Sequence, residues 1–446
     1  MKSNKESNLL PMASILKTWW PLAASWILMG MELPVLSAFV ARLADPKIHL
    51  AAYGGIVFPL ALIIEAPVIM LLAASTALSK DWASYQKLRT YMLGAGATLT
   101  ILHIIIAFTP FYYTVVGKLI GAPEEIIEPA RIGLMIMTPW TWAIAYRRFN
   151  QGILIRFGHS GSIGIGTGIR LGVDAVVLIS GLIAQKVPGI VVATSAVSAG
   201  VVAEALYVGL RVQPVLKNEL KTAKVIEPAL TYRAFAKFYA PLAMTSLMML
   251  MVQPMGSAAL SRMPRALDSL AVWPIVSGLI FMLRSMGMAF NEVVVARLDD
   301  QFSFENLRRF TSYLTGFSSL LLVIFVVSPM ANWWLQDVSA LEIDLVNLAK
   351  TGLWIGILMP GLTTYQSWYQ GVILHSRKTR AIPEAVGIFL LITSTSMWMG
   401  VLWQKMIGLY VTLGAFILGS LIQTLWLKYR SSTALDILYK RDVQIE

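Results

Sequence analysis

Twelve long apolar segments dominate this chain and restrict what it can fold into. The hydrocarbon core of a bilayer is about 30 Å thick, so a helix of roughly 20 apolar residues crosses it. The composition agrees, because 57% of the 446 residues are hydrophobic and only 13% are charged. We therefore expect an all-α polytopic membrane protein with twelve transmembrane helices. The segments begin near residues 15, 50, 88, 127, 162, 189, 234, 271, 310, 345, 382 and 407.

The second six segments repeat the first six about 220 residues later. Apolar residues match by chance, but prolines, arginines and glutamine–glycine pairs at an offset of 219 or 220 residues do not. Such repeats are typical of transporters that work between two lobes. Because each half has an even number of spans, we predict two six-helix lobes, 1–213 and 232–446, related by a pseudo-twofold axis along the membrane normal. A cytoplasmic connector, 214–231, joins them. The matches include Pro34 with Pro254, Arg42 with Arg262, Tyr146 with Tyr365, and Gln151-Gly152 with Gln370-Gly371.

The net charge of +12 is interpreted as a sign of membrane orientation and not of nucleic-acid binding. Most of the 36 lysines and arginines fall on the side shared by the two termini and the even-to-odd loops. The positive-inside rule then places both termini in the cytoplasm, and we expect a bacterial inner membrane. Basic pairs such as Arg147-Arg148 are interpreted as topological charges near lipid headgroups. With no cysteine and only four scattered histidines, we expect no metal site and no cofactor.

Charged residues inside the apolar segments are the main candidates for function, because each costs several kcal/mol if it faces lipid. A buried carboxyl without a counter-charge can retain a proton near neutral pH. We assign proton or sodium coupling to Glu32, Glu65 and Asp174, with simple solvation in a water-filled cavity as the alternative. The complete set is Glu32, Glu65, Arg170, Asp174, Glu204, Arg284 and Glu292.

Arg284 is the predicted contact for an anionic substrate, because a guanidinium stays charged and can clamp a carboxylate or phosphate group. Arg170 and Asp174 are further candidate substrate contacts. They lie four residues apart, so an ion pair along one helix is an equally good reading. The repeat places the neutral Ser285 opposite Glu65, so the charges differ between the halves.

Glu204, Glu292, Pro34 and Pro254 are assigned to a gate or to the cavity wall. Both glutamates are predicted near the cytoplasmic ends of their spans, where extension of the side chain to the interface is the simpler alternative. The two prolines occupy matching repeat positions and should kink the first helix of each half. A static packing kink is the alternative to a gating bend.

A run of glycines in the fifth span superficially suggests a dinucleotide loop, but it follows no predicted strand. Gly164, Gly168 and Gly172 recur every four residues and line one helix face. Small residues at this spacing allow close packing of membrane helices. We therefore expect this face to contact a neighbouring helix.

Several short stretches resemble the progressive ankylosis protein family, within the multidrug/oligosaccharidyl-lipid/polysaccharide exporter (MATE-like) superfamily. Twelve spans, a mid-helix proline in spans one and seven, and a short basic loop between lobes are similar to the superfamily. The resemblance implies a V-shaped exporter with a cleft between lobes, acting on anions such as pyrophosphate, nucleotides or citrate. MATE-type members instead expel lipophilic cations, using acidic residues of the first lobe. The stretches are Leu50-Ala-Ala-Tyr-Gly54, Ser79-Lys80, Gly152-Ile-Leu154, Pro241-Leu-Ala243 and Ser261-Arg262.

We therefore expect a monomeric secondary active transporter, not an enzyme, that exports small anionic metabolites by rocking-bundle alternating access. Its partners would be the small-molecule substrate, a coupling proton or sodium ion, and membrane lipids. The alternatives are a multidrug cation antiporter, a flippase for lipid-linked precursors and an intramembrane prenyltransferase-type enzyme. The enzyme would need paired aspartate-rich motifs to hold magnesium pyrophosphate, and Asp299-Asp300 is the only adjacent aspartate pair.

Overall fold

The computed structural model describes residues 11–225, 227, 229–298, 300, 303–376 and 380–444. Asp299, one half of the aspartate pair considered for the enzyme alternative, lies outside the described residues, as do residues 1–10 at the predicted cytoplasmic N-terminus. Within the described ranges every regular element is a helix, so the predicted all-α fold class is confirmed.

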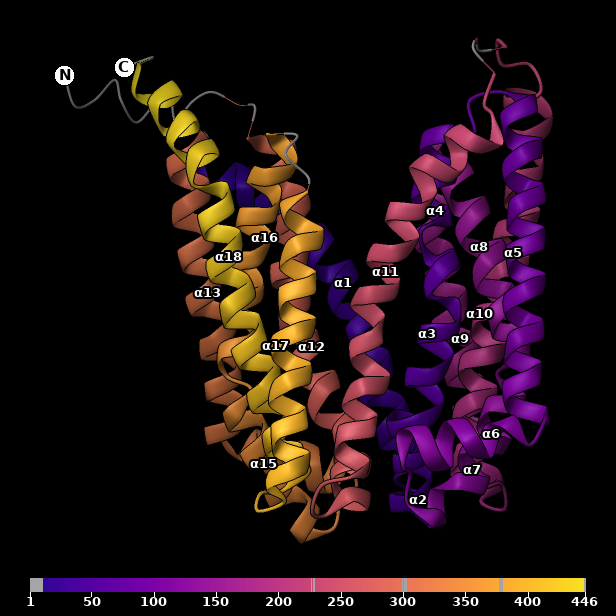
Figure 1. Ribbon diagram of the computed structural model, residues 1–446, viewed down its shortest axis with the longest axis vertical. Helices are drawn as coiled ribbons and strands as arrows, with labels where there is room; N and C mark the ends of the chain where they lie inside the picture. The colour runs from indigo at the N-terminus through magenta and orange to yellow at the C-terminus, as the bar shows by residue number, and fades with distance from the viewer. Residues whose placement is uncertain are drawn as a thin grey trace. The chain divides into compact units, whose positions relative to one another are not determined.

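The helices follow one another with short connections (Figure 1). Those of the first half are α1 (Met12–Val40), α2 (Pro46–Leu50), η1 (Ala51–Val57), α3 (Phe58–Ile69), α4 (Leu71–Leu78), α5 (Trp82–Phe108), α6 (Phe111–Tyr113), η2 (Thr114–Ile120), α7 (Glu124–Ile136), α8 (Thr138–Arg156), α9 (Gly161–Ala184), α10 (Gly189–Val215) and η3 (Leu216–Leu220). Those of the second half are α11 (Tyr232–Ser261), α12 (Ala266–Arg297), α13 (Ser303–Val327), α14 (Pro329–Asn332), η4 (Trp333–Val338), α15 (Ile343–Ile355), α16 (Leu358–His375), α17 (Ala381–Trp403) and α18 (Gly408–Gln444).

Eleven helices of the described chain are long and apolar enough to cross a membrane, so this is an integral multi-pass membrane protein. The fourth predicted span is more polar than the other eleven and is not among these helices. The structure forms it as two helices, α7 and α8, that meet at Met137. The physical reason for its low hydropathy is that α8 carries Arg147 and Arg148 in its middle.

The chain divides into two compact units. Unit 1 contains residues 1–38, 263–265 and 272–446, and unit 2 contains residues 39–262 and 266–271. The lobes predicted from the repeat, 1–213 and 232–446, group the helices differently. In the compact units, most of α1 belongs with the second half of the chain, and α11 belongs with the first half.

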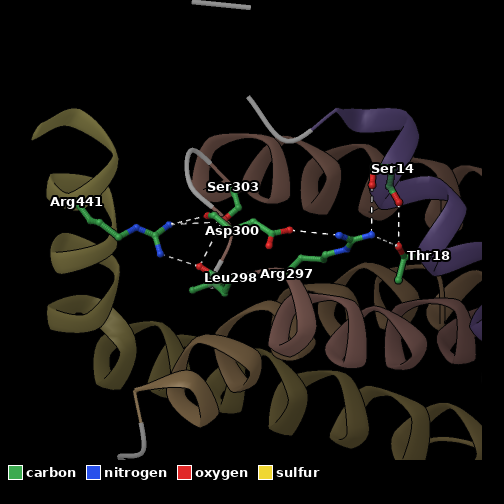
Figure 2. A network of polar contacts seen from close by, with 7 residues as sticks. All are labelled: Ser14, Thr18, Arg297, Leu298, Asp300, Ser303 and Arg441. Carbon is green, nitrogen blue, oxygen red and sulfur yellow. Dashed lines mark hydrogen bonds and ion pairs between the residues drawn. The ribbon is translucent and has the colours of Figure 1, made fainter. Parts of the chain in front are cut away.

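Hydrogen bonds hold α1 in unit 1. The Trp19 indole Nε1 donates to the Met286 carbonyl of α12 at 2.9 Å. About three turns further along α12, Arg297 Nη2 donates to Thr18 Oγ1 at 3.0 Å and to Ser14 Oγ at 3.3 Å (Figure 2). Figure 2 also shows Arg441 of α18 donating to the Leu298 carbonyl, so that the C-terminal helix closes the same end of α12.

Side-chain hydroxyls hold α11 in unit 2. Ser246 Oγ donates to the Ala66 carbonyl at 2.6 Å, and the Tyr239 hydroxyl donates to the Pro67 carbonyl. Both acceptors lie in the last turn of α3, where backbone carbonyls lack partners from their own helix. The contact therefore satisfies groups that would be costly to leave unpaired in a membrane.

The repeat is visible in the turns that join the last two spans of each half. Gln185 and Gln404 both adopt a left-handed conformation at the end of a helix, with φ of 53° and 54°. Each side-chain amide donates to the carbonyl three residues earlier, at 2.8 Å and 2.7 Å respectively. Just before each turn a glycine faces a valine of the next helix, Gly181 with Val192 and Gly400 with Val411.

The packing role predicted for the glycine stripe of α9 is wrong. Gly164, Gly168 and Gly172 are exposed, and a Cβ added to any of them would meet no atom within 4 Å. The glycines of α9 that contact α10 are Gly166 and Gly181, on another face of the helix. The error arises because spacing shows which residues share a face but not which neighbour that face meets.

Candidate functional site

The structure distributes the predicted site residues between the two units. Those in unit 2 are Glu65, Arg170, Asp174, Glu204 and Pro254, and those in unit 1 are Glu32, Pro34, Arg284 and Glu292. Each unit is therefore described by itself.

Helix α8 carries two arginines of unit 2, Arg147 and Arg148, and packs against α3, α4, α5 and α10 (Figure 1). It starts after the break at Met137 with a proline in its first turn, which suits a helix start because no backbone donor is wasted there. At Gly152 the helix comes so close to α4 that a Cβ would overlap Ser75. This fixed register turns Arg147 and Gln151 into the interior.

Glu204 of α10 is the centre of a buried polar cluster and is only 1% exposed. Arg147 Nη1 donates to Glu204 Oε2 in a short ion pair. Gln151 Nε2 donates to Glu204 Oε1 at 3.0 Å, and Arg170 Nε of α9 lies 3.8 Å from Oε2. Helices α8 and α9 thus place donor groups around the one carboxylate of α10, which is what a buried charge requires.

Asp174 lies one turn along α9 from Arg170 and is also buried. It is accommodated by Gly200 of α10, where a Cβ would overlap the Asp174 carboxylate. Gly166 plays the same part for Glu204, since a Cβ there would lie 3.3 Å from Glu204 Cγ. Glycines therefore make the room that the two acids occupy between α9 and α10.

Glu65 of α3 is the third buried acid of the cluster, with 3% of its surface exposed. Its Oε2 is buried without a hydrogen-bond partner in the described structure. Helix α3 packs against α8, the helix that carries Arg147 and Arg148. Unit 2 thus encloses three guanidinium groups and three carboxyl groups, which we call the charged cluster: Glu65, Arg147, Arg148, Arg170, Asp174 and Glu204.

Unit 1 has neutral residues at all six corresponding repeat positions. The counterparts of Arg147 and Glu204 are Gln366 and Gln423, and both are buried. Asp174 corresponds to Thr393, which is fully buried. The remaining counterparts are Ser285 for Glu65, Ser367 for Arg148 and Phe389 for Arg170.

The packing around these counterparts resembles the packing around the charged residues of unit 2. A Cβ at Gly419 would overlap the Thr393 hydroxyl, just as a Cβ at Gly200 would overlap the Asp174 carboxylate. Gln366 Nε2 donates to the Ser420 carbonyl at 3.0 Å, so the α16–α18 contact is made by a neutral amide. The same helix packing forms without charge, and the charges of unit 2 are therefore not a requirement of the fold.

The predicted site residues of unit 1 have other surroundings. Arg284 is half-buried in α12, and its Nε donates to Thr363 Oγ1 of α16 at 2.8 Å. Glu292 is exposed, and Glu32 is half-buried in α1. The cluster therefore includes two of the three acids assigned to coupling, Glu65 and Asp174.

The two prolines lie inside α1 and α11, as their repeat positions predict. In unit 1 the Pro34 ring packs closely on α12, since a Cβ at Gly278 would lie 2.9 Å from Pro34 Cδ. Pro254 is half-buried in α11.

The topological interpretation is wrong for Arg147, which is 5% exposed and paired with Glu204. Extension of Glu204 to the interface is excluded by the same pair. A signal for both was available in the repeat, because Gln151-Gly152 fixes the register of α8 and places Arg147 one turn away on the same face. Among the described residues no group of three or more histidine, aspartate or glutamate side chains could hold a metal ion.

The sequence matches no protein-family model and no curated protein. Solved structures share its fold. An inward-facing multidrug resistance MATE family transporter of the MOP superfamily is similar with a TM-score of 0.72 and 14% identity, over 92% of this chain and 96% of that one. The lipid II flippase MurJ, in an inward closed conformation, is similar with a TM-score of 0.69 and 14% identity, over 94% and 91%.

A MOP superfamily transporter from Pyrococcus furiosus is similar with a TM-score of 0.62 and 16% identity, over 95% and 97%. Its description reports a binding pocket of reversed polarity that suggests a different function. These similarities establish a MATE-like transporter fold for this chain. None of the three is a progressive ankylosis protein, so that closer resemblance stays a prediction.

Proposed function

We propose that this protein is a secondary active transporter that exports small anions of the carboxylate or phosphate class. The fold that it shares with MOP superfamily transporters supports transport. The observation that supports an anionic substrate is the set of guanidinium groups inside the membrane segments, Arg147, Arg148 and Arg170 in unit 2 and Arg284 in unit 1. Guanidinium groups bind carboxylates and phosphates through paired donors.

The proposed roles follow the chemistry of the side chains. Arg284 and Arg170 contact the substrate, with Asp174 beside Arg170. Glu32, Glu65 and Asp174 bind or relay the coupling proton or sodium ion. The remaining residues assigned to the gate or cavity are Glu204, Glu292, Pro34 and Pro254.

The main support for these roles comes from the neutral residues that unit 1 has where unit 2 has charged ones. Buried ionic groups are costly, and a neutral set of similar size often stabilises a fold as well or better. Unit 1 contains such a set at the same positions, with Gln366, Thr393 and Gln423 in place of the ions. Because the fold does not need the charged cluster of unit 2, the simplest explanation is that these residues bind the transported substrate or the coupling ion.

Uptake into inside-out proteoliposomes tests the proposal directly. Labelled citrate and labelled pyrophosphate are compared with a labelled lipophilic cation under an imposed pH gradient. Accumulation of an anion, and not of the cation, is the expected result. Accumulation of the cation alone would contradict the anion proposal and favour a multidrug antiporter.

Two variants connect that assay to the cluster. Glu65→Gln and Asp174→Asn should each abolish gradient-driven transport while the protein still reaches the membrane at normal levels. Arg156→Gln is the matched control, because Arg156 lies on α8 as well but is exposed. Full transport by both acidic variants would remove the coupling role from these residues.

A flippase for lipid-linked precursors is the second candidate. The observation that favours it is the similarity to the lipid II flippase MurJ along most of both chains. Lipid-linked pyrophosphates carry the same anionic group that the guanidinium groups suit. If neither small anions nor the cation accumulate, translocation of a fluorescent lipid-linked pyrophosphate becomes the decisive measurement.

A further inference from the structure

A groove between α17 and α18 of unit 1 has no part in the proposed function. The two helices pack against each other and are joined by a short turn, residues 404–407 (Figure 1). The groove has a volume of about 890 Å³, within the roughly 300–1,000 Å³ that is usual for small-molecule sites. Its surface is almost entirely apolar, and its lining includes Gly400, Trp403, Met406, Tyr410, Gly414 and Leu418.

Glycines on both helices create this groove. At Gly414 of α18 a Cβ would meet no atom within 4 Å, so the helix surface is open at this position. At Gly400 of α17 a Cβ would overlap Val411, so the two helices approach each other closely there. The large side chains of Trp403 and Tyr410 also line the groove. A close helix contact beside large side chains therefore leaves a hollow that the protein itself does not fill.

The groove lies at one end of two membrane-spanning helices. Trp403 is the last residue of α17, and Tyr410 belongs to the first turn of α18. Tryptophan and tyrosine favour the level of the lipid headgroups, which places the mouth of the groove at the membrane surface. From Tyr410 to Leu418 the groove follows α18 for about 12 Å, which is most of the roughly 15 Å depth of one lipid leaflet.

The side chains that line the groove are also exposed. Leu402, Trp403 and Leu418 expose 67%, 55% and 44% of their surface. An apolar surface of this kind would be a liability in water, but on a membrane-spanning helix it is the surface that acyl chains cover. The groove therefore has the polarity, the depth and the length to hold an acyl chain.

The turn at the mouth of the groove carries positive charge. Lys405 is exposed, and the next residue, Met406, lines the groove. The backbone N–H of Gly408 donates to the Pro264 carbonyl at 3.1 Å, which fixes the turn against the loop before α12. Arg265, directly after Pro264, is a second exposed cation at this end of unit 1. Charge at the mouth and an apolar interior match the two parts of an anionic phospholipid.

The corresponding turn of unit 2 shows that the groove residues are not required by the turn itself. That turn has the same left-handed glutamine, followed by Lys186 at the position of Lys405. Three large residues of the groove have smaller counterparts there, Ala184 for Trp403, Val187 for Met406 and Val191 for Tyr410. Unit 2 thus keeps the lysine without the large side chains and supplies a natural control for the charge alone.

We propose that the groove binds one acyl chain of an anionic phospholipid, whose phosphate group contacts Lys405. A zwitterionic phospholipid with the same chains fits the groove equally well but gains less from the cation. The site is independent of the proposed function, because neither the groove nor Lys405 belongs to the residues assigned to transport. Failure of anion transport therefore leaves this inference standing, and the reverse also holds.

Native mass spectrometry of the delipidated, full-length protein measures the binding. The protein is titrated with phosphatidylglycerol and, separately, with phosphatidylcholine that carries the same acyl chains. One phosphatidylglycerol molecule should bind about fivefold more tightly than phosphatidylcholine, which is the contribution expected from one lysine close to an anionic headgroup.

Gly414→Leu tests the groove. Its side chain should occupy the space that Gly414 leaves open, and the binding of both lipids should weaken by at least about tenfold. Gly168→Leu is the matched control, because a Cβ at Gly168 of α9 also meets no atom within 4 Å. This control should bind both lipids as wild type does.

Lys405→Gln tests the headgroup contact. The variant should bind phosphatidylglycerol only as tightly as phosphatidylcholine, whose own binding should not change. Lys186→Gln removes the same charge from the corresponding turn of unit 2 and should retain the preference for phosphatidylglycerol. Because Lys405 is exposed, this variant decides the headgroup contact even if Gly414→Leu fails to fold.

Four results would overturn the inference. The first is the absence of a bound phospholipid in wild type, and the second is unchanged binding in a folded Gly414→Leu variant. The third is a preference for phosphatidylglycerol that survives Lys405→Gln or that Lys186→Gln abolishes equally. The fourth is a protein dimer that Gly414→Leu dissociates, which would make the groove a contact between two copies of this chain.

Discussion

At the scale of single residues, Glu204 shows why the charged cluster behaves as a unit. It accepts hydrogen bonds from Arg147 and Gln151 and lies near Arg170. Removing one partner of a buried pair leaves an uncompensated charge, which costs far more than the intact pair contributes. Substitution of both partners should therefore cost less stability than substitution of one partner alone.

Glu204→Gln alone should lower the free energy of unfolding by about 3–5 kcal/mol, because Arg147 is left buried without its partner. The double variant Arg147→Gln/Glu204→Gln should recover most of that loss, because it copies the Gln366 and Gln423 pair of unit 1. Thermal unfolding in detergent, followed by tryptophan fluorescence, measures both. A double variant as unstable as the single one would show that the unit 1 arrangement cannot be transferred.

Arg284→Ala should raise the KM for citrate by about tenfold, which corresponds to about 1.4 kcal/mol, and should spare cation binding. The physical reason is the loss of a guanidinium that Thr363 holds in place. Arg430→Ala, which breaks an exposed pair with Glu384, is the control. If the Arg284→Ala variant loses affinity for anions and cations equally, the role of Arg284 is structural and not substrate binding.

The sequence alone predicted that charges occur inside the spans, but it could not pair them. Hydropathy identifies a span without stating which face is interior, so the sequence predicts a topological role for Arg147 and not its ion pair. Asp174 is identifiable as an acid in an apolar run, yet the glycine that accommodates it, Gly200, lies in a different span. Pairing across helices is a property of packing, and the repeat supplied the only sequence-level guide to it.

At the scale of helices, glycines on different faces of α9 have different packing roles. Gly181 of α9 lies so close to Val192 that a Cβ would overlap it, whereas Gly168 has no neighbour within 4 Å. Spacing predicted that the Gly168 face would pack, and the structure shows the opposite.

Gly181→Ala should therefore destabilise the protein by about 1–3 kcal/mol, because extra volume in a packed contact forces the helices apart. Gly168→Ala is the matched control and should be neutral or stabilising by about 0.5–1 kcal/mol, because alanine favours the helix. Melting temperatures of the two variants in the same detergent give the comparison. An equal fall in melting temperature for both variants would mean that the Gly168 face of α9 is also packed against a neighbour.

Arg297→Ala should loosen the start of α1, since Arg297 is the donor that holds Ser14 and Thr18 in Figure 2. Hydrogen exchange of the backbone amides of the first two turns should become faster, while exchange in α11 stays unchanged. Arg309→Ala, which removes an exposed ion pair with Glu305, should leave both unaffected. If hydrogen exchange in α1 stays unchanged, the hydrogen bond of Trp19 is sufficient to hold the start of this helix.

At the scale of the whole molecule, the repeat and the compact units divide the chain differently. The sequence predicted the twelve spans and their twofold repetition, because both depend on local composition. It gave no sign that α1 and α11 pack with the opposite half, because Trp19–Met286 and Ser246–Ala66 are contacts between residues distant in the chain. Long-range pairing of this kind leaves no periodic signal.

A chain cut between Lys224 and Val225 tests this exchange. Each half expressed alone should aggregate or be degraded, because it lacks the helix that completes its compact unit. The two halves expressed together should purify as one complex, recovered through an affinity tag on either half. A stable, monodisperse N-terminal half would contradict the exchange.

The place of α1 in unit 1 also has a consequence for how the protein is made. Trp19 must wait for Met286, which follows it by 267 residues. At about 5–20 residues per second, synthesis of that stretch takes roughly 13–53 s. During this interval α1 lacks its hydrogen bond to α12, and lipid or an insertase must accommodate the Trp19 indole until Met286 has been made. The order of translation thus places the insertion of α1 well before its packing against α12.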